Sequence, residues 1–220
     1  MAESTGKLIE RLVAEGGPVR RLRPPVVRAS FWLLAVTTAG VAAIAVFADL
    51  GAFSSRFVGS LLWLEWPATL LTGIAAIVAA FQLSMPDRSA AWALLPLPPL
   101  ALWIGTSGYS CFKHWIVAGP GGWELGESAN CFIFILLFSL PLALSLLVLL
   151  RRAAPLTPVR VAAVGALGVS ALAAAALQFF HPFDVTFIDL GVHLGAVALV
   201  VLGASAIEYL SPGSDLRRPA

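Results

Sequence analysis

The chain has 220 residues, of which 59% are hydrophobic and only 12% are charged, and its net charge is +2. Soluble domains are about 45–50% apolar, so this composition excludes an ordinary soluble globular protein. So small a net charge gives no indication of nucleic-acid binding, and we expect no direct nucleic-acid partner.

The first predicted element is a short amphipathic helix over residues 6–15. Its apolar side chains fall on one face at helical spacing, and these are Leu8, Ile9, Leu12 and Val13. Gly16-Gly17-Pro18 ends the helix, and an extended basic stretch follows that contains Arg20, Arg21 and Arg23. Two interpretations stay open: an interfacial helix with topology-setting arginines, or a docking segment for a cytosolic partner.

Six apolar runs follow, each near the roughly 20 residues that a helix needs to cross a bilayer. They are residues 31–50, 58–82, 90–107, 131–150, 161–180 and 190–210. Twelve of the 14 Lys and Arg residues fall on one side of this topology, and only Arg56 and Lys113 fall on the other. Because cytoplasmic segments carry the Lys and Arg excess, we expect both termini in the cytoplasm. The prediction is an all-α integral membrane bundle with an N-terminal tail (1–29), a six-helix domain (30–210) and a C-terminal tail (211–220).

Three features inside the spans bear on packing or function. Glu65 places a carboxyl group in the second span, a costly position that indicates either a functional role or contact with headgroups. Three prolines in residues 96–99 predict a kink or a break in the middle of the third span. The small residues of the fifth span and the Gly191-xxx-Gly195 motif of the sixth predict close helix contacts within the bundle.

Sulfur, imidazole and carboxylate side chains gather on the predicted outer side. They are Cys111, Cys131, His114, His181, His193, Asp184 and Asp189. Thiolate and imidazole groups suit zinc, copper and similar metals, and a thiol pair outside the cytoplasm can also form a disulfide. CxxC spacing is absent, so a zinc finger or a thioredoxin-type motif is excluded. Three interpretations remain: a sensing or transient metal site, a structural disulfide, or two small buried hydrophobic residues.

Several pieces of the sequence, taken in order, resemble the NrsF-type family of bacterial inner-membrane anti-sigma factors. They are LIERLVAEGGPVRRLRPP, Ala79-Ala80-Phe81 to Met85-Pro86-Asp87-Arg88, Cys111-Phe112-Lys113-His114-Trp115, Cys131-Phe132, His181-Pro182-Phe183-Asp184 and His193-Leu194-Gly195-Ala196. The resemblance implies that the cytoplasmic N-terminal segment holds an extracytoplasmic-function sigma factor at the inner membrane. It also implies that a metal or oxidant acts on outward-facing cysteines, here Cys111 and Cys131, to release that factor. The apolar face of the first helix and the three arginines after it would then contact the sigma factor.

Two other classes of protein compete with this interpretation. A small metal or solute transporter could use Glu65, His193 and the cysteines, but charged residues are absent from the interior of the first, fourth and fifth spans. A quinone-linked thiol oxidoreductase requires two cysteine pairs, and the chain has two cysteines in all. We therefore expect no enzymatic activity and no cofactor beyond a transient metal ion.

Overall fold

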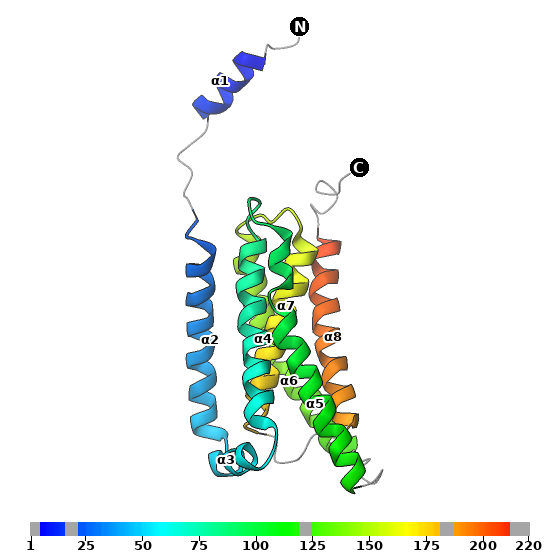
Figure 1. Cartoon of the computed structure of the whole chain (residues 1–220). Helices are drawn as coiled ribbons and strands as arrows, with labels where there is room; N and C mark the ends of the chain where they lie inside the picture. The colour runs from blue at the N-terminus through cyan, green and yellow to red at the C-terminus, as the bar shows by residue number, and fades with distance from the viewer. Residues whose placement is uncertain (1–4, 16–21, 119–124, 181–186, 212–220) are drawn as a thin grey trace.

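The computed structural model describes residues 5–15, 22–118, 125–180 and 187–211, and within these ranges every regular element is a helix. The elements are α1 (Thr5–Glu15), α2 (Pro25–Phe47), α3 (Leu50–Gly59), α4 (Leu62–Leu83), η1 (Ala90–Leu94), α5 (Leu97–Ala118), α6 (Leu125–Arg151), α7 (Pro158–Leu177) and α8 (Phe187–Leu210). Six stretches are long and apolar enough to cross a membrane, in the order predicted from sequence. They run alternately up and down as one bundle (Figure 1).

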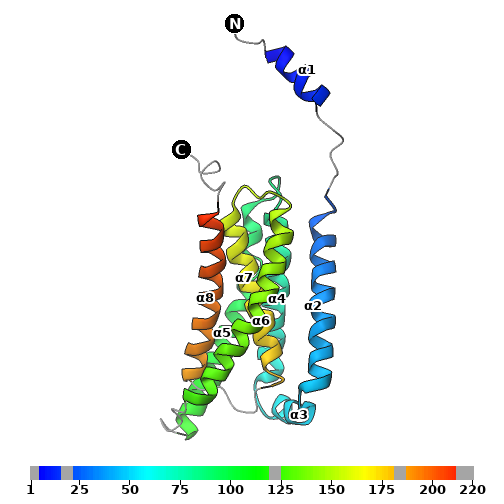
Figure 2. The same ribbon diagram turned by 180° about the vertical axis from the view of Figure 1, so that it is seen from behind.

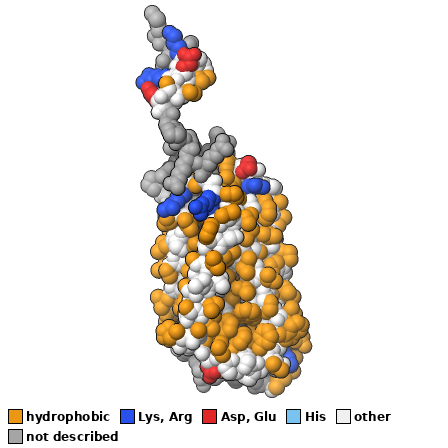
Figure 3. Space-filling model, turned by 90° about the vertical axis from the view of Figure 1, so that its left-hand side faces the viewer, with side chains coloured by type: hydrophobic (Ala, Val, Ile, Leu, Met, Phe, Trp, Pro, Cys, Tyr) orange, Lys and Arg blue, Asp and Glu red, His pale blue; other side chains and the backbone are white. Residues whose placement is uncertain are grey.

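The two ends of the bundle differ in charge. At the tail end, where α2 begins and where α4, α6 and α8 finish, six arginines lie in or next to the helices. They are Arg23, Arg28, Arg88, Arg151, Arg152 and Arg160. The α3 end, opposite to it, has Arg56 and Lys113 among the described residues. Figure 3 shows the basic side chains gathered near the tail end above an apolar belt, a distribution that agrees with the predicted positive bias.

Helix α2 stands at one edge of the bundle in both ribbon views (Figures 1 and 2). It begins at Pro25, earlier than predicted, because proline at a first helical position gives up no hydrogen bond. Arg28 fixes it there: Nη2 donates to the Leu149 carbonyl oxygen at 2.5 Å, and the guanidinium lies 5.2 Å from the centre of the Phe81 ring. Trp32 Nε1 adds a 3.1 Å hydrogen bond to Ser145 Oγ. The tail end of α2 is therefore attached to α4 and α6.

Helix α3 was not predicted, because its residues were divided between two spans and the loop joining them. Asp49 starts it by accepting hydrogen bonds from the amides of Gly51 and Ala52, at 2.9 and 3.0 Å. Phe53 stacks on Phe179 beyond the end of α7, with ring centres 4.2 Å apart. Arg56 donates a hydrogen bond to the carbonyl of Gln178. These contacts fix α3 against the end of α7.

The prolines of residues 96–99 break the third span, as the sequence predicted, but the break lies near the start of the span rather than in its middle. The chain forms the 3₁₀ helix η1 and then starts α5 at Leu97, which places Pro98 and Pro99 in the first turn. Proline is tolerated there, since first-turn amides have no partner within the helix. Helix α5 also continues to Ala118, well past the predicted end at residue 107.

Helices α4 and α7 form the centre of the bundle and approach each other closely. A methyl group added at Gly73 would lie 2.8 Å from Leu172, and one added at Gly168 would lie 2.9 Å from Ile77. The expectation that small residues in the fifth span permit close contact is therefore confirmed.

The Gly191-xxx-Gly195 motif behaves differently. Both glycines are exposed on the outside of α8, and a methyl group added at either would meet nothing within 4 Å. The expected contact within the bundle was wrong, because the face of α8 that packs is set by Ala196 and Ala204 instead.

Candidate functional site

The N-terminal helix α1 presents an uncovered apolar face. Leu8, Ile9, Leu12 and Val13 are 45–73% exposed, and the helix has no buried residue. Its polar side carries an ion pair of 2.9 Å between Arg11 and Glu15, one turn apart. An isolated helix of about ten residues is marginal in water, so its apolar face requires a surface to cover it.

The basic stretch after α1 lies partly outside the described residues. Arg20 and Arg21 fall there, so their contacts with a partner stay predictions. Arg23 is described, and its guanidinium carbon lies 5.6 Å from the centre of the Phe31 ring in α2. This cation–π contact holds the last part of the basic stretch beside α2.

A second candidate site lies inside the bundle, in the half nearer the α3 end. Glu65, in the first turn of α4, is only 5% exposed. Its carboxylate oxygen Oε1 accepts a 2.7 Å hydrogen bond from Ser107 Oγ of α5, which is also buried. The costly carboxyl group predicted from sequence therefore faces the protein interior and joins two helices.

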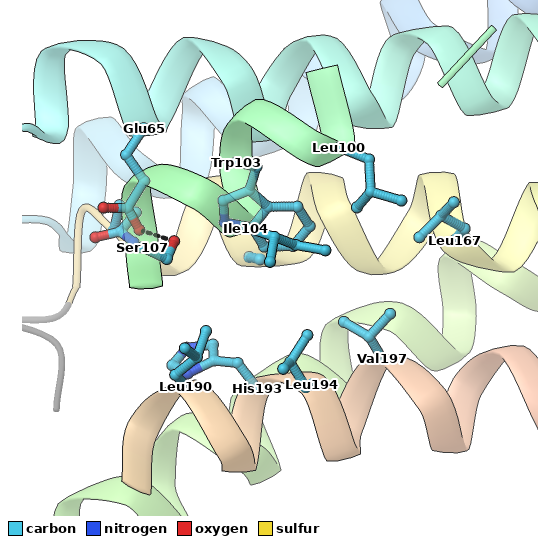
Figure 4. A pocket seen from close by; sticks show the side chains of 12 residues that line it. Glu65, Leu100, Trp103, Ile104, Ser107, Leu167, Leu190, His193, Leu194 and Val197 are labelled. Carbon is cyan, nitrogen blue, oxygen red and sulfur yellow. Dashed lines mark hydrogen bonds between the residues drawn. The ribbon is translucent and has the colours of Figure 1, made fainter. Parts of the chain in front are cut away.

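A cavity of about 50 Å³ lies beside this hydrogen bond, among α4, α5, α7 and α8. Its polar lining comes from Glu65, Ser107, Gln178 and His193. The rest of its wall is apolar: Leu100, Trp103, Ile104, Leu167, Ala174, Leu190, Leu194 and Val197. Figure 4 shows Glu65 and Ser107 on one side of the space and His193 of α8 on the other.

His193 is held in position by its own helix. Its Nδ1 lies 2.5 Å from the Asp189 carbonyl oxygen, and because a carbonyl only accepts, Nδ1 is the protonated nitrogen. The imidazole predicted as a metal ligand thus lines the cavity together with Glu65.

The two cysteines are buried within helices rather than placed on the loop between them. Cys111 of α5 is 1% exposed, and Cys131 of α6 is 5% exposed. Cys131 packs in an apolar cluster with Ile135, Leu177 and Ala196. Both lie toward the α3 end, as predicted, but neither presents its thiol on the surface of the bundle. Buried thiols react slowly, so a sensing role requires helices α5 and α6 to move.

The predicted metal ligands are only partly placed. His114 is half-buried on α5, whereas His181 and Asp184 lie outside the described residues. Among the residues that are described, no three His, Cys, Asp or Glu side chains converge to hold a metal ion. The predicted metal site stays a prediction.

Comparison with known proteins settles the family. The family model described as "NrsF: Negative regulator of sigma F" matches residues 12–210, which include all six apolar spans. The chain belongs to the NrsF family. This family description makes a sigma factor the indicated partner. No curated protein and no solved structure matches the chain.

The NrsF match begins inside α1 and ends at the last residue of α8. It therefore contains Leu12 and Val13 but begins after Leu8 and Ile9. The matched region also contains Glu65 and Ser107 of the buried pair and both cysteines.

Sequence reasoning missed part of the internal site. Ser107 of α5 and Gln178, which directly follows α7, were not singled out. Ser107 follows Leu100, Trp103 and Ile104 at helical spacing, and that placement is the one indication in the sequence that it points inward.

Proposed function

We propose that this NrsF family member is a membrane-bound anti-sigma factor. It holds an extracytoplasmic-function sigma factor against the inner bacterial membrane through its cytoplasmic N-terminal segment. A metal or oxidant signal in the envelope, acting through Cys111 and Cys131, releases the sigma factor.

The observation that carries the proposal is the uncovered apolar face of α1 in a member of a family of negative regulators. Fully burying one Leu, Ile or Val side chain contributes about 1.5–3 kcal/mol, so four such side chains can anchor a partner. The arginines that follow suit acidic side chains, because a guanidinium binds a carboxylate through two parallel hydrogen bonds.

The attachment of α2 supports a connection between the tail and the bundle. Arg28 and Trp32 fix the start of α2 to α4 and α6, a few residues after the basic stretch that ends at Arg23. A change in the packing of α6 would therefore move the point from which the tail emerges. Cys131 lies in α6, so a signal at this thiol acts on a helix that contacts α2.

Release by oxidation would follow from thiol chemistry. Joining Cys111 and Cys131 in a disulfide transfers two electrons and two protons to the oxidant, and it ties α5 to α6. Binding of a thiophilic metal would have a similar effect without electron transfer. His114 and His193 are the imidazoles that the structure describes in the same half of the bundle.

The test is capture of a purified sigma factor, taken from the gene next to the one that encodes this chain, by membranes that contain the full-length protein. We expect Ile9→Asp with Leu12→Asp to weaken capture at least tenfold, because two charges would enter the apolar contact. Charge reversal at Arg20 and Arg21 should weaken it as well. Lys7→Gln, on the polar side of α1, is the matched control and should leave capture unchanged.

Membrane immunoblots establish that each variant inserts to the same level. Equal capture by a chain that lacks residues 1–21, a deletion that keeps Arg28 and Trp32, would show that the tail is not the binding segment.

A further inference from the structure

We propose that the cavity beside Glu65 binds a protonated amine whose apolar chain enters from the side of the bundle. This inference rests on the cavity alone and is independent of sigma-factor binding.

The charge of Glu65 indicates a cationic ligand. Within the described part of the chain, its carboxylate receives one hydrogen bond, from Ser107, and forms no salt bridge. A single hydroxyl does not offset the cost of burying a carboxylate in an apolar bundle. Arg56 acts on Glu65 through space, but it does not line the cavity, and it bonds to the Gln178 carbonyl. A cation inside the cavity would place an opposite charge in direct contact with the carboxylate.

The shape of the cavity limits the size of that cation. Its volume of about 50 Å³ exceeds the roughly 10–15 Å³ that one water needs. It therefore has room for an ammonium group with a short carbon chain. Trp103 forms part of the wall, and indole is the aromatic side chain that attracts cations most strongly. Ser107, Gln178 and His193 offer polar atoms around the same space.

The rim of the cavity explains why the ligand would be amphipathic. Ile104 of α5 and Leu194 of α8 line it and are 44% and 45% exposed, so it reaches the lateral surface of the bundle between these helices. Leu100 and Val197 extend this apolar strip. An alkyl chain can lie along the strip while its ammonium group reaches Glu65.

A metal ion is a weaker match for the same space. In the described ranges no three His, Cys, Asp or Glu residues converge on one point, whereas most protein-bound zinc ions have three or four protein ligands. A protonated amine needs one carboxylate and a few hydrogen-bond acceptors. The cavity provides these.

The experiment measures thermal unfolding of the full-length protein in detergent micelles, with n-butylammonium as the probe and n-butanol as its uncharged counterpart. At ten times Kd we expect butylammonium to raise Tm by about 3–6 °C, and butanol to raise it by less than one third as much. Glu65→Gln keeps an acceptor for Ser107 but removes the charge, so it should abolish the shift. Glu208→Gln is the matched control. Glu208 is the other buried glutamate among the described residues, is 6% exposed and lies at the tail end in an ion pair with Arg151.

A second variant guards against misfolding of Glu65→Gln. Val197→Phe fills the cavity from α8 and leaves Glu65 in place, so it should reduce the butylammonium shift at least threefold. Equal shifts in wild type and in both cavity variants would overturn the proposal. So would equal shifts with butylammonium and butanol, which would mean apolar binding alone. The absence of any shift in the wild type at millimolar butylammonium would overturn it too.

Discussion

Ser107 of α5 donates a 2.7 Å hydrogen bond to the carboxylate of Glu65, in the first turn of α4, and both side chains are buried. This bond ties α5 to the central helix α4 at the α3 end, where α5 meets α8 only sparsely. A buried group that loses its hydrogen-bond partner retains the full cost of its desolvation. The stability of this half of the bundle should therefore depend on the pair.

The first prediction concerns this pair. Ser107→Ala should lower the free energy of unfolding by about 1.5–3 kcal/mol, the range for hydrogen bonds to charged groups. In a Glu65→Gln background the same change should cost only about 1 kcal/mol, since the acceptor is then uncharged. Chemical unfolding in micelles gives all four corners of this double-mutant cycle. Equal losses in both backgrounds would mean that the two side chains are not coupled.

The second prediction compares two glycines in different surroundings. Gly168→Ala should destabilise the protein by about 1–3 kcal/mol, because the new methyl group would lie 2.9 Å from Ile77 on α4. Gly195→Ala, on the open face of α8, should be neutral or stabilising by up to about 1 kcal/mol, because alanine favours helix. Thermal unfolding of the two variants side by side checks the order. If Gly195→Ala destabilised the protein more than Gly168→Ala, α8 rather than α7 would form the close helix contact.

The sequence was sufficient for features that depend on local pattern. The six spans, the amphipathic face of α1 and the basic bias at the tail end follow from hydropathy, helical period and charge placement. The sequence did not decide whether Glu65 faces the protein interior or the lipid headgroups. The inward position depends on Ser107, which is 42 residues away in sequence and contacts Glu65 because α5 packs on α4.

The features that the sequence did not reveal depend on distant contacts. Helix α3 has a mixed composition and is fixed by Phe179, which lies far along the chain. The burial of Cys111 and Cys131 depends on how α5 and α6 are rotated, and weakly amphipathic spans give little indication of rotation. The orientation of Gly191 and Gly195 was misjudged for the same reason.

The third prediction concerns topology. With 12 of the 14 Lys and Arg residues assigned to one side, both termini should be cytoplasmic. A reporter that works only in the cytoplasm should be active when it is fused at Ala220. A cysteine placed at Gly119, in a chain lacking Cys111 and Cys131, should react with a membrane-impermeant maleimide added from outside. An outward C-terminus would exclude the six-span arrangement.

The fourth prediction concerns the thiols. The chain has two cysteines in all, so maleimide labelling reports on Cys111 and Cys131 alone. Because both are buried, labelling of the folded protein should be at least tenfold slower than after unfolding in detergent, and the inducing metal or oxidant should change the rate.

Cys111→Ser with Cys131→Ser should leave insertion and sigma-factor capture intact but abolish the response in a transcription reporter. A degraded variant with constitutive sigma activity would instead assign the cysteines to packing. Full induction by stress in the double variant would remove them from the mechanism. The immunoblot and the reporter together separate these outcomes, since the first measures the amount of protein and the second measures release.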